Sequence, residues 1–136
     1  MSGISSSASR RALRFGSGSA QAKSLGEDGR KQVSDYINGG GGYVGIHSAT
    51  DTEYDWRWYG KLVGGYFTSH PKTQSAKFII KDKDFPATEF FTDTVWQRTD
   101  ELYNFKNFNP DVNVILTVDE SSYEGGTHGN YHPMAW

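Results

Sequence analysis

The stretch that most constrains the fold is Gly39–Asp51, which reads Gly-Gly-Gly-Gly-Tyr-Val-Gly-Ile-His-Ser-Ala-Thr-Asp. Four consecutive glycines end any preceding helix, and the short apolar run Tyr43–Ile46 follows them directly. An apolar run of this length, bounded by glycine on one side and by Ser, Thr and Asp on the other, predicts a strand buried on both faces. Polar residues at the carboxyl end of such a strand are where open α/β sheets bind ligands. His47 is therefore the first candidate for a functional residue.

The residues before the glycines predict a helix over 27–38. Acidic side chains occupy its first turn, and the apolar side chains Val33, Tyr36 and Ile37 recur at helical spacing. Gly39 stands where a helix commonly ends. A helix that leads into a buried strand is half of a βαβ unit, which favours an α/β fold with a parallel sheet.

The rest of the chain alternates apolar runs with turns. Its patterns predict a short helix over 55–63 and strands over 75–81, 95–105 and 112–118. A polar, glycine-rich loop follows the last of these strands. Because a strand is predicted so late and no element follows it, we expect the domain to be incomplete.

Composition excludes several classes of protein. At 136 residues the chain supports one domain. Sixteen acidic and fourteen basic residues give a formal charge of −2, which argues against a nucleic-acid partner. No apolar stretch approaches the ~18 residues of a membrane span, so we expect a soluble chain with no membrane partner. The absence of cysteine excludes disulfides, a thiolate nucleophile and Cys-ligated zinc, and it leaves the compartment open.

Residues 1–24 differ in composition from the rest of the chain. They are rich in Ser and Arg, contain no acidic residue, and lack the apolar core of a secretory signal. We predict a disordered or non-native leader here, with an organelle transit peptide as the alternative. The folded domain is then expected over residues 25–136.

Three histidines are candidates for acid/base chemistry. His47 ends the predicted strand, and His70 and His132 each precede a proline, whereas His128 is expected in solvent. Histidine moves protons near neutral pH and is the commonest metal ligand. No compact motif such as His-Glu-x-x-His is present, so a metal site would need ligands from separate segments. A divalent metal such as zinc, held by the first three histidines, is therefore left open.

Carboxylates and aromatic rings complete the set of candidates. Asp51, Asp100 and Glu101 are of the right type to orient the imidazoles or to pair with them. Trp56 and Trp58 are candidates to stack on a substrate, because a pyranose presents an apolar face to flat rings. The chain holds eight Phe, eight Tyr and four Trp, although core packing is the commoner role of such rings.

A series of short motifs runs in one order along residues 25–136. They are Gly-Gly-Gly-Tyr-Val-Gly-Ile-His-Ser-Ala-Thr-Asp, Tyr54-Asp55-Trp56, Trp58-Tyr59-Gly60, Ser69-His70-Pro71, Thr99-Asp100-Glu101-Leu102-Tyr103-Asn104-Phe105, Asp119-Glu120-Ser121, Tyr123-Glu124-Gly125-Gly126, His132-Pro133 and Trp136. As a linked series they resemble the trehalose-utilisation (ThuA-like) family. Arg57 departs from that pattern, at a position where a proline is expected.

The resemblance implies a flavodoxin-like α/β domain with a mostly parallel sheet and flanking helices, truncated here at both ends. The related class I glutamine amidotransferases carry a nucleophilic cysteine after a strand, where His47 stands in this chain, so amidotransferase activity is not expected. The family is associated with the use of trehalose and other disaccharides, including 3-keto sugars. Its domains occur beside sugar-dehydrogenase or glycoside-hydrolase-like modules.

We therefore expect His-based acid/base or metal-assisted chemistry on a small sugar, either trehalose or a keto-disaccharide. The expected catalytic residues are the motif-matched His47, His70, Glu101 and His132. The expected substrate-binding residues are Asp51, Trp56, Trp58 and Asp100. The alternative is a non-catalytic carbohydrate-binding or interaction module attached to a sugar-active enzyme.

Overall fold

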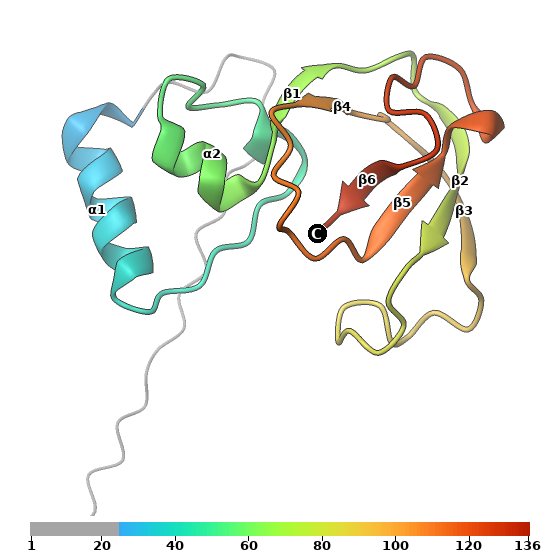
Figure 1. Ribbon diagram of the computed structural model, residues 1–136, viewed down its shortest axis with the longest axis horizontal. Helices are drawn as coiled ribbons and strands as arrows, with labels where there is room; N and C mark the ends of the chain where they lie inside the picture. The colour runs from blue at the N-terminus through green and yellow to red at the C-terminus, as the bar shows by residue number, and fades with distance from the viewer. Residues whose placement is uncertain (1–24) are drawn as a thin grey trace, which may run out of the picture.

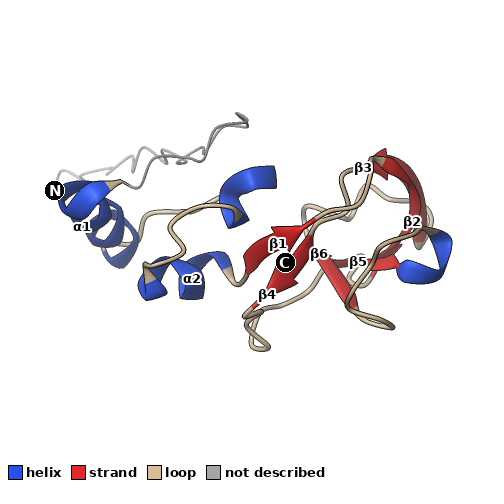
Figure 2. Cartoon of the chain, turned by 90° about the horizontal axis from the view of Figure 1, so that it is seen from above, coloured by secondary structure: helices blue, strands red, loops and turns tan. Residues whose placement is uncertain are grey.

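The computed structural model describes residues 25–136, so the leader predicted over residues 1–24 lies outside the described residues. In chain order the elements are α1 (Gly26–Asn38), the 3-10 turn η1 (His47–Thr50), α2 (Arg57–Val63), β1 (Tyr66–Ser69), β2 (Gln74–Ile80), β3 (Val95–Asp100), β4 (Asn104–Lys106), β5 (Leu116–Asp119), the 3-10 turn η2 (Glu120–Ser122) and β6 (His132–Ala135). In Figures 1 and 2 the two α-helices lie at one end of the molecule and β2 and β3 lie at the other. None of the described helices is long and apolar enough to cross a membrane.

Helix α1 confirms the helix predicted over 27–38. Its last turn closes with a hydrogen bond from the Gly39 N–H to the Asp35 carbonyl, and Val33 is its buried residue. The helix is tied to the rest of the molecule through Glu53. One carboxylate oxygen of Glu53 accepts the Leu25 N–H at 2.6 Å, and the other pairs with Arg30 Nε at 2.7 Å.

The larger sheet has four strands in the order β3-β2-β5-β6. Every pairing in it is antiparallel, which corrects the mostly parallel sheet expected from the sequence. Along β2, alternate side chains Ala76, Phe78 and Ile80 are buried, as the period of two in a strand requires. They pack with Leu102, Leu116 and Val118 to form the main apolar core.

The predicted strand over 95–105 is divided into β3 and β4. After β3 the chain leaves the larger sheet, and β4 pairs antiparallel with β1 in a separate two-stranded sheet. The break begins where Asp100 Oδ1 accepts the N–H of Glu101, and Leu102 then enters the core with no exposed surface. This break places Glu101 between the two sheets, next to the end of β1.

The segment Tyr43–Ile46 is not the buried strand that its apolar sequence predicts. Apart from an isolated bridge at Tyr43 it forms no strand, and Val44 and Ile46 are 51% and 56% exposed. The segment runs between the helical end and the strands, away from the four-stranded sheet (Figure 1). Apolar patterning reports a preference for burial, but burial in a sheet also needs neighbouring strands on both sides.

Two other predicted elements have different bounds. The strand predicted over 112–118 begins only at Leu116, and the loop predicted near the C-terminus contains the short strand β6. In α2 the residues that are buried are Tyr59 and Val63, while Trp58 and Leu62 are partly buried around them.

Candidate active site between the two sheets

His47 lies on an unusual backbone at the start of η1. Its φ is +54°, in the left-handed region, and it follows an extended Ile46. A side chain other than glycine rarely adopts this conformation, and such strained residues concentrate at functional sites. The turn aims the imidazole toward the end of β3, where Glu101 lies.

Glu101 brings two of the predicted histidines together. Its Oε2 atom lies 2.9 Å from Nε2 of His47 and 3.9 Å from Nε2 of His70. His47 begins η1, His70 follows β1, and Glu101 follows β3, so the three side chains come from three separate segments. The side chains are 35–39% exposed, which leaves the group open to a ligand.

The hydrogen bonds fix which ring nitrogens carry protons. A carboxylate only accepts, so His47 donates its Nε2–H to Glu101, and its Nδ1 is the nitrogen that can take up a proton. His70 donates its Nδ1–H to the Pro71 carbonyl at 2.7 Å, so its Nε2 is the nitrogen that can exchange a proton. Each imidazole thus has one nitrogen held by an acceptor and one available for chemistry.

Tyr103 forms the wall behind the two imidazoles. Its ring lies 4.9 Å from that of His47, and it stacks at 5.5 Å on His70 with an angle of only 16° between the planes. Phe67 packs on the same ring at 4.3 Å. Burial, together with the nearby carboxylates led by Glu101, raises the pKa of Tyr103 to about 12, so its hydroxyl keeps its proton at neutral pH.

Tyr54 and Asp51 lie beside this wall. The Tyr54 hydroxyl donates to Asp51 Oδ1 and, at 3.2 Å, to the Phe67 carbonyl. Lys106 sits over the Tyr54 ring at 5.0 Å. Burial raises the pKa of Tyr54, and the hydrogen bond to Asp51 raises it further. Asp51 therefore lies close to the histidine group, and its role in substrate binding stays a prediction.

Sequence reasoning missed Tyr54, Phe67 and Tyr103 as members of the site. Tyr54 and Tyr103 do fall within the motifs that carry the family resemblance, and that was the available signal. Nothing in the spacing of Phe67 distinguishes it from a core aromatic residue.

His132 does not join this group. It is fully buried, and both of its ring nitrogens have partners inside the protein. Nε2 lies 2.8 Å from the Tyr103 carbonyl, and Nδ1 lies 2.8 Å from Glu120 Oε1. His128, expected in solvent, lies in the same network, where its Nε2 accepts the Phe105 N–H. His132 thus approaches the site only through the backbone of Tyr103.

The remaining predicted substrate-binding residues have other partners. Asp100 pairs with Arg98 Nε at 2.7 Å and caps the turn into Glu101. Trp56 and Trp58 stack on each other at 5.0 Å and pack against the α2 cluster around Tyr59. These contacts give Asp100, Trp56 and Trp58 structural roles.

The predicted three-histidine metal set is not assembled, because His132 is held elsewhere. Within residues 25–136 there is no cluster of three or more His, Cys, Asp or Glu side chains arranged to hold a metal ion. His47, His70 and Glu101 are the donors closest to such an arrangement, at the distances given above.

A comparison with models of protein families identifies the family of this chain. The model of the ThuA family, described as trehalose utilisation, matches residues 11–136. The chain belongs to the ThuA family. The match covers all three residues of the His47–Glu101–His70 group. No curated protein matches the chain.

Two solved structures of ThuA-like proteins share this fold. One, from Bacteroides uniformis ATCC 8492, has a TM-score of 0.70 and 22% sequence identity, over 90% of this chain and 53% of that structure. The other, from Parabacteroides merdae ATCC 43184, has a TM-score of 0.69 and 16% identity, over 91% of this chain and 53% of that structure. This ThuA chain therefore spans about half the length of these relatives.

Proposed function

We propose that this ThuA chain acts on a sugar by acid/base chemistry centred on His47. The observation that carries the proposal is the single carboxylate of Glu101, which holds His47 at 2.9 Å and faces His70 at 3.9 Å. Two imidazoles around one carboxylate supply both a proton acceptor and a proton donor within one open site. The family's description as trehalose utilisation supports a sugar as the substrate.

The donor and acceptor pattern gives each residue a role. Glu101 orients His47 and stabilises the imidazolium that forms when Nδ1 accepts a proton. His70, when protonated on Nε2, is the group that returns a proton to the departing oxygen. Tyr54 and Tyr103 keep their hydroxyl protons at neutral pH and present aromatic surface next to the imidazoles.

A keto-disaccharide is the substrate that suits these roles. A keto group makes the hydrogen on the adjacent carbon acidic, so an imidazole is a strong enough base to remove it. When His47 takes that proton, the electron pair forms a carbon–carbon double bond and the glycosidic carbon–oxygen bond breaks. The proton from His70 then neutralises the released sugar oxygen, which completes a lyase-type cleavage.

The test compares two replacements of His47. Both H47N and H47G remove the imidazole but suit a residue with φ of +54°, so the local backbone is preserved. We expect turnover of keto-trehalose to fall by about 10²–10⁴-fold in both variants, measured by chromatography of the products. Unchanged turnover in either folded variant would remove the catalytic role of His47.

A separate measurement tests the carbohydrate-binding alternative. Calorimetry with trehalose and with its keto form, run on the unmodified chain, separates binding from turnover. Binding without product formation would favour the non-catalytic module.

Several finer expectations stay predictions for this ThuA protein. They concern a divalent metal such as zinc, and association with sugar-dehydrogenase or glycoside-hydrolase-like modules. Metal analysis of protein purified without an affinity tag tests the first of these. A fully active, metal-free preparation would exclude a metal requirement.

A further inference from the structure

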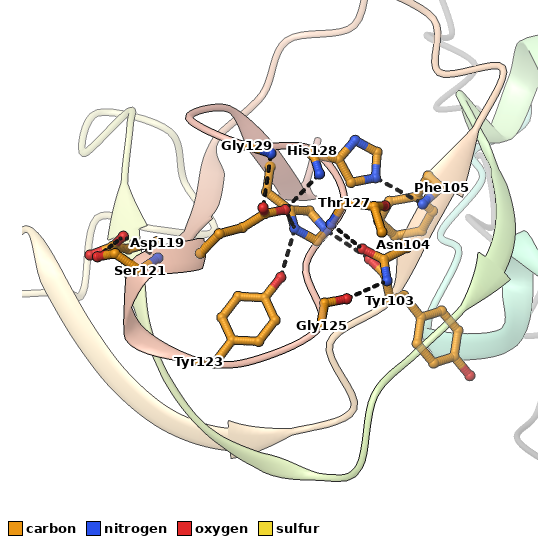
Figure 3. A network of polar contacts seen from close by, with 12 residues as sticks. Tyr103, Asn104, Phe105, Asp119, Ser121, Tyr123, Gly125, Thr127, His128 and Gly129 are labelled. Atoms are coloured by element: carbon orange, nitrogen blue, oxygen red, sulfur yellow. Dashed lines mark hydrogen bonds and ion pairs between the residues drawn. The ribbon is translucent and has the colours of Figure 1, made fainter.

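The loop before β6 and the residues after β3 share a buried polar network, which Figure 3 draws. At its centre His132 is fully buried, and its two ring nitrogens point at the Tyr103 carbonyl and at Glu120. Burying a titratable side chain is costly unless every polar atom has a partner. Nothing in the proton transfers of His47 and His70 uses this histidine directly, so its burial calls for another explanation.

The partners of His132 fix the orientation of its ring. The Tyr103 carbonyl only accepts hydrogen bonds, so Nε2 carries a hydrogen. Burial alone would raise the pKa of Glu120, but the backbone N–H groups of His128 and Gly129 and the His132 ring together lower it. Glu120 is therefore an ionised acceptor, and its Oε1 lies 2.8 Å from Nδ1 of His132. The Tyr123 hydroxyl lies 2.9 Å from the same nitrogen, so both ring nitrogens of His132 are held by partners inside the protein.

The rest of the network holds the same stretch of backbone. Asn104 follows Tyr103, and its side chain donates to the Gly125 carbonyl and accepts the Thr127 N–H, both at 3.0 Å. Residues 103 and 104 are thus attached to the 120–132 loop by three hydrogen bonds. In Figure 3 the ring of Tyr103 points away from the network that holds its carbonyl.

That ring is the wall of the candidate active site. It contacts His47 at 4.9 Å and His70 at 5.5 Å, while Glu101, two residues earlier, holds the carboxylate that both imidazoles face. A change in the Tyr103 peptide therefore moves a ring that touches both proton-transferring groups.

We propose that Glu120 and His132 are positioning residues, which fix the Glu101–Tyr103 turn from behind and thereby align His47 and His70. This inference rests on the proposed function for its catalytic consequence. Its structural part, the alignment of the two imidazoles, stands independently. Since misplacing reacting groups by about 1 Å costs about 10²-fold in rate, loss of these positioning contacts should lower the rate measurably.

The first test needs no substitution. Long-range ¹H–¹⁵N spectra of the histidine rings in the 136-residue chain report the protonation of each nitrogen. We expect Nε2 of His132 to carry a hydrogen at neutral pH, because the Tyr103 carbonyl only accepts. An Nε2 without a hydrogen would overturn the bond on which the positioning role depends.

The second test compares two substitutions at His132. In H132Q the amide nitrogen reaches about as far as Nε2 and preserves the donor to the Tyr103 carbonyl, whereas in H132N that donor is lost. H128Q is the control, because the His128 ring lies 4.3 Å from the His132 ring in the same network but bonds to Phe105 and not to Tyr103. We expect H132N to shift the ring signals of His47 and His70, and H132Q and H128Q to leave them close to their original positions.

The kinetic part of the test distinguishes the two proposals. For H132N we expect kcat on the keto-disaccharide to fall by about 10–100-fold with little change in KM, and H132Q to recover most of it. If the unmodified chain has no turnover, the proposed function fails, and the ring signals still decide the positioning role. Unshifted His47 and His70 signals in folded H132N would overturn that role.

Discussion

Thr50, three residues after His47, has a buried hydroxyl without a hydrogen-bond partner among the described residues. The residue is only 6% exposed, so the hydroxyl has little access to bulk solvent. A buried, unsatisfied hydroxyl destabilises a protein, whereas a methyl group of the same size does not. We predict that T50V raises the free energy of unfolding by about 1 kcal/mol, measured by urea denaturation.

Thr88 provides the matched control for this prediction. It is 4% exposed, but its hydroxyl donates to the carbonyls of Asp82 and Phe85. The same replacement, T88V, should lower the free energy of unfolding by about 1 kcal/mol. Equal losses in both variants would mean that the Thr50 hydroxyl has a partner.

His128 should make stability depend on pH. Burial lowers the pKa of its imidazole below the ordinary value of 6.5, the charge on His132 lowers it further, and Glu120 opposes both. On acidification, His128 therefore binds a proton in the unfolded chain at a higher pH than in the folded chain. The stability that His128 contributes is fully present above pH 6.5 and is lost as pH falls through its folded pKa.

We predict that urea denaturation between roughly pH 8 and pH 5 shows a smaller loss of stability on acidification in H128Q than in the unmodified chain. Glutamine can still accept the Phe105 N–H but does not titrate. The difference between the two proteins isolates His128 from the titration of Glu120 and His132. An identical pH dependence in both proteins would contradict the lowered pKa.

At the scale of elements, α1 depends on one buried carboxylate. The Glu53 side chain is 1% exposed and holds both the Leu25 N–H and Arg30. E53Q removes the charge that pairs with Arg30 while keeping the size of the side chain. We predict a loss of about 2 kcal/mol in the free energy of unfolding, measured by urea denaturation followed by circular dichroism.

The exposed pair between Lys31 and Asp35 on the same helix is the control. These side chains are 74% and 61% exposed, so solvent screens their attraction. D35N should cost less than about 0.5 kcal/mol. Comparable losses in E53Q and D35N would show that the docking of α1 does not depend on Glu53.

The break that divides residues 95–105 into β3 and β4 cannot be predicted from strand propensity. β-branched and aromatic residues continue through the break, so propensity predicts one strand. Two tertiary contacts decide otherwise, because Leu102 enters the core of the larger sheet while β4 pairs with β1. The acidic pair is divided at this break, because Asp100 pairs with Arg98 while Glu101 faces the two histidines.

At the scale of the whole molecule, Val44 and Ile46 form an exposed apolar edge. They are 51% and 56% exposed, although their sequence is typical of a buried strand. We predict that I46T changes the free energy of unfolding by less than about 0.5 kcal/mol and reduces the binding of a dye specific for apolar surface. I80T is the matched control, because Ile80 is 5% exposed in the core. It should cost about 2–4 kcal/mol.

The sequence by itself predicted the family, a helix over 27–38 and a strand over 75–81, and it marked His47, Glu101 and His70 as candidates for one site. These depend on local patterns and ordered motifs, which can be read along a chain. The tertiary structure alone decided that the sheets are antiparallel, that Val44 and Ile46 are exposed, and that His132 lies behind the site. Each of these depends on which distant segments meet, and side-chain periodicity carries no information about that choice. Glu101 reaches two histidines more than thirty residues away because the chain changes sheets at residue 101.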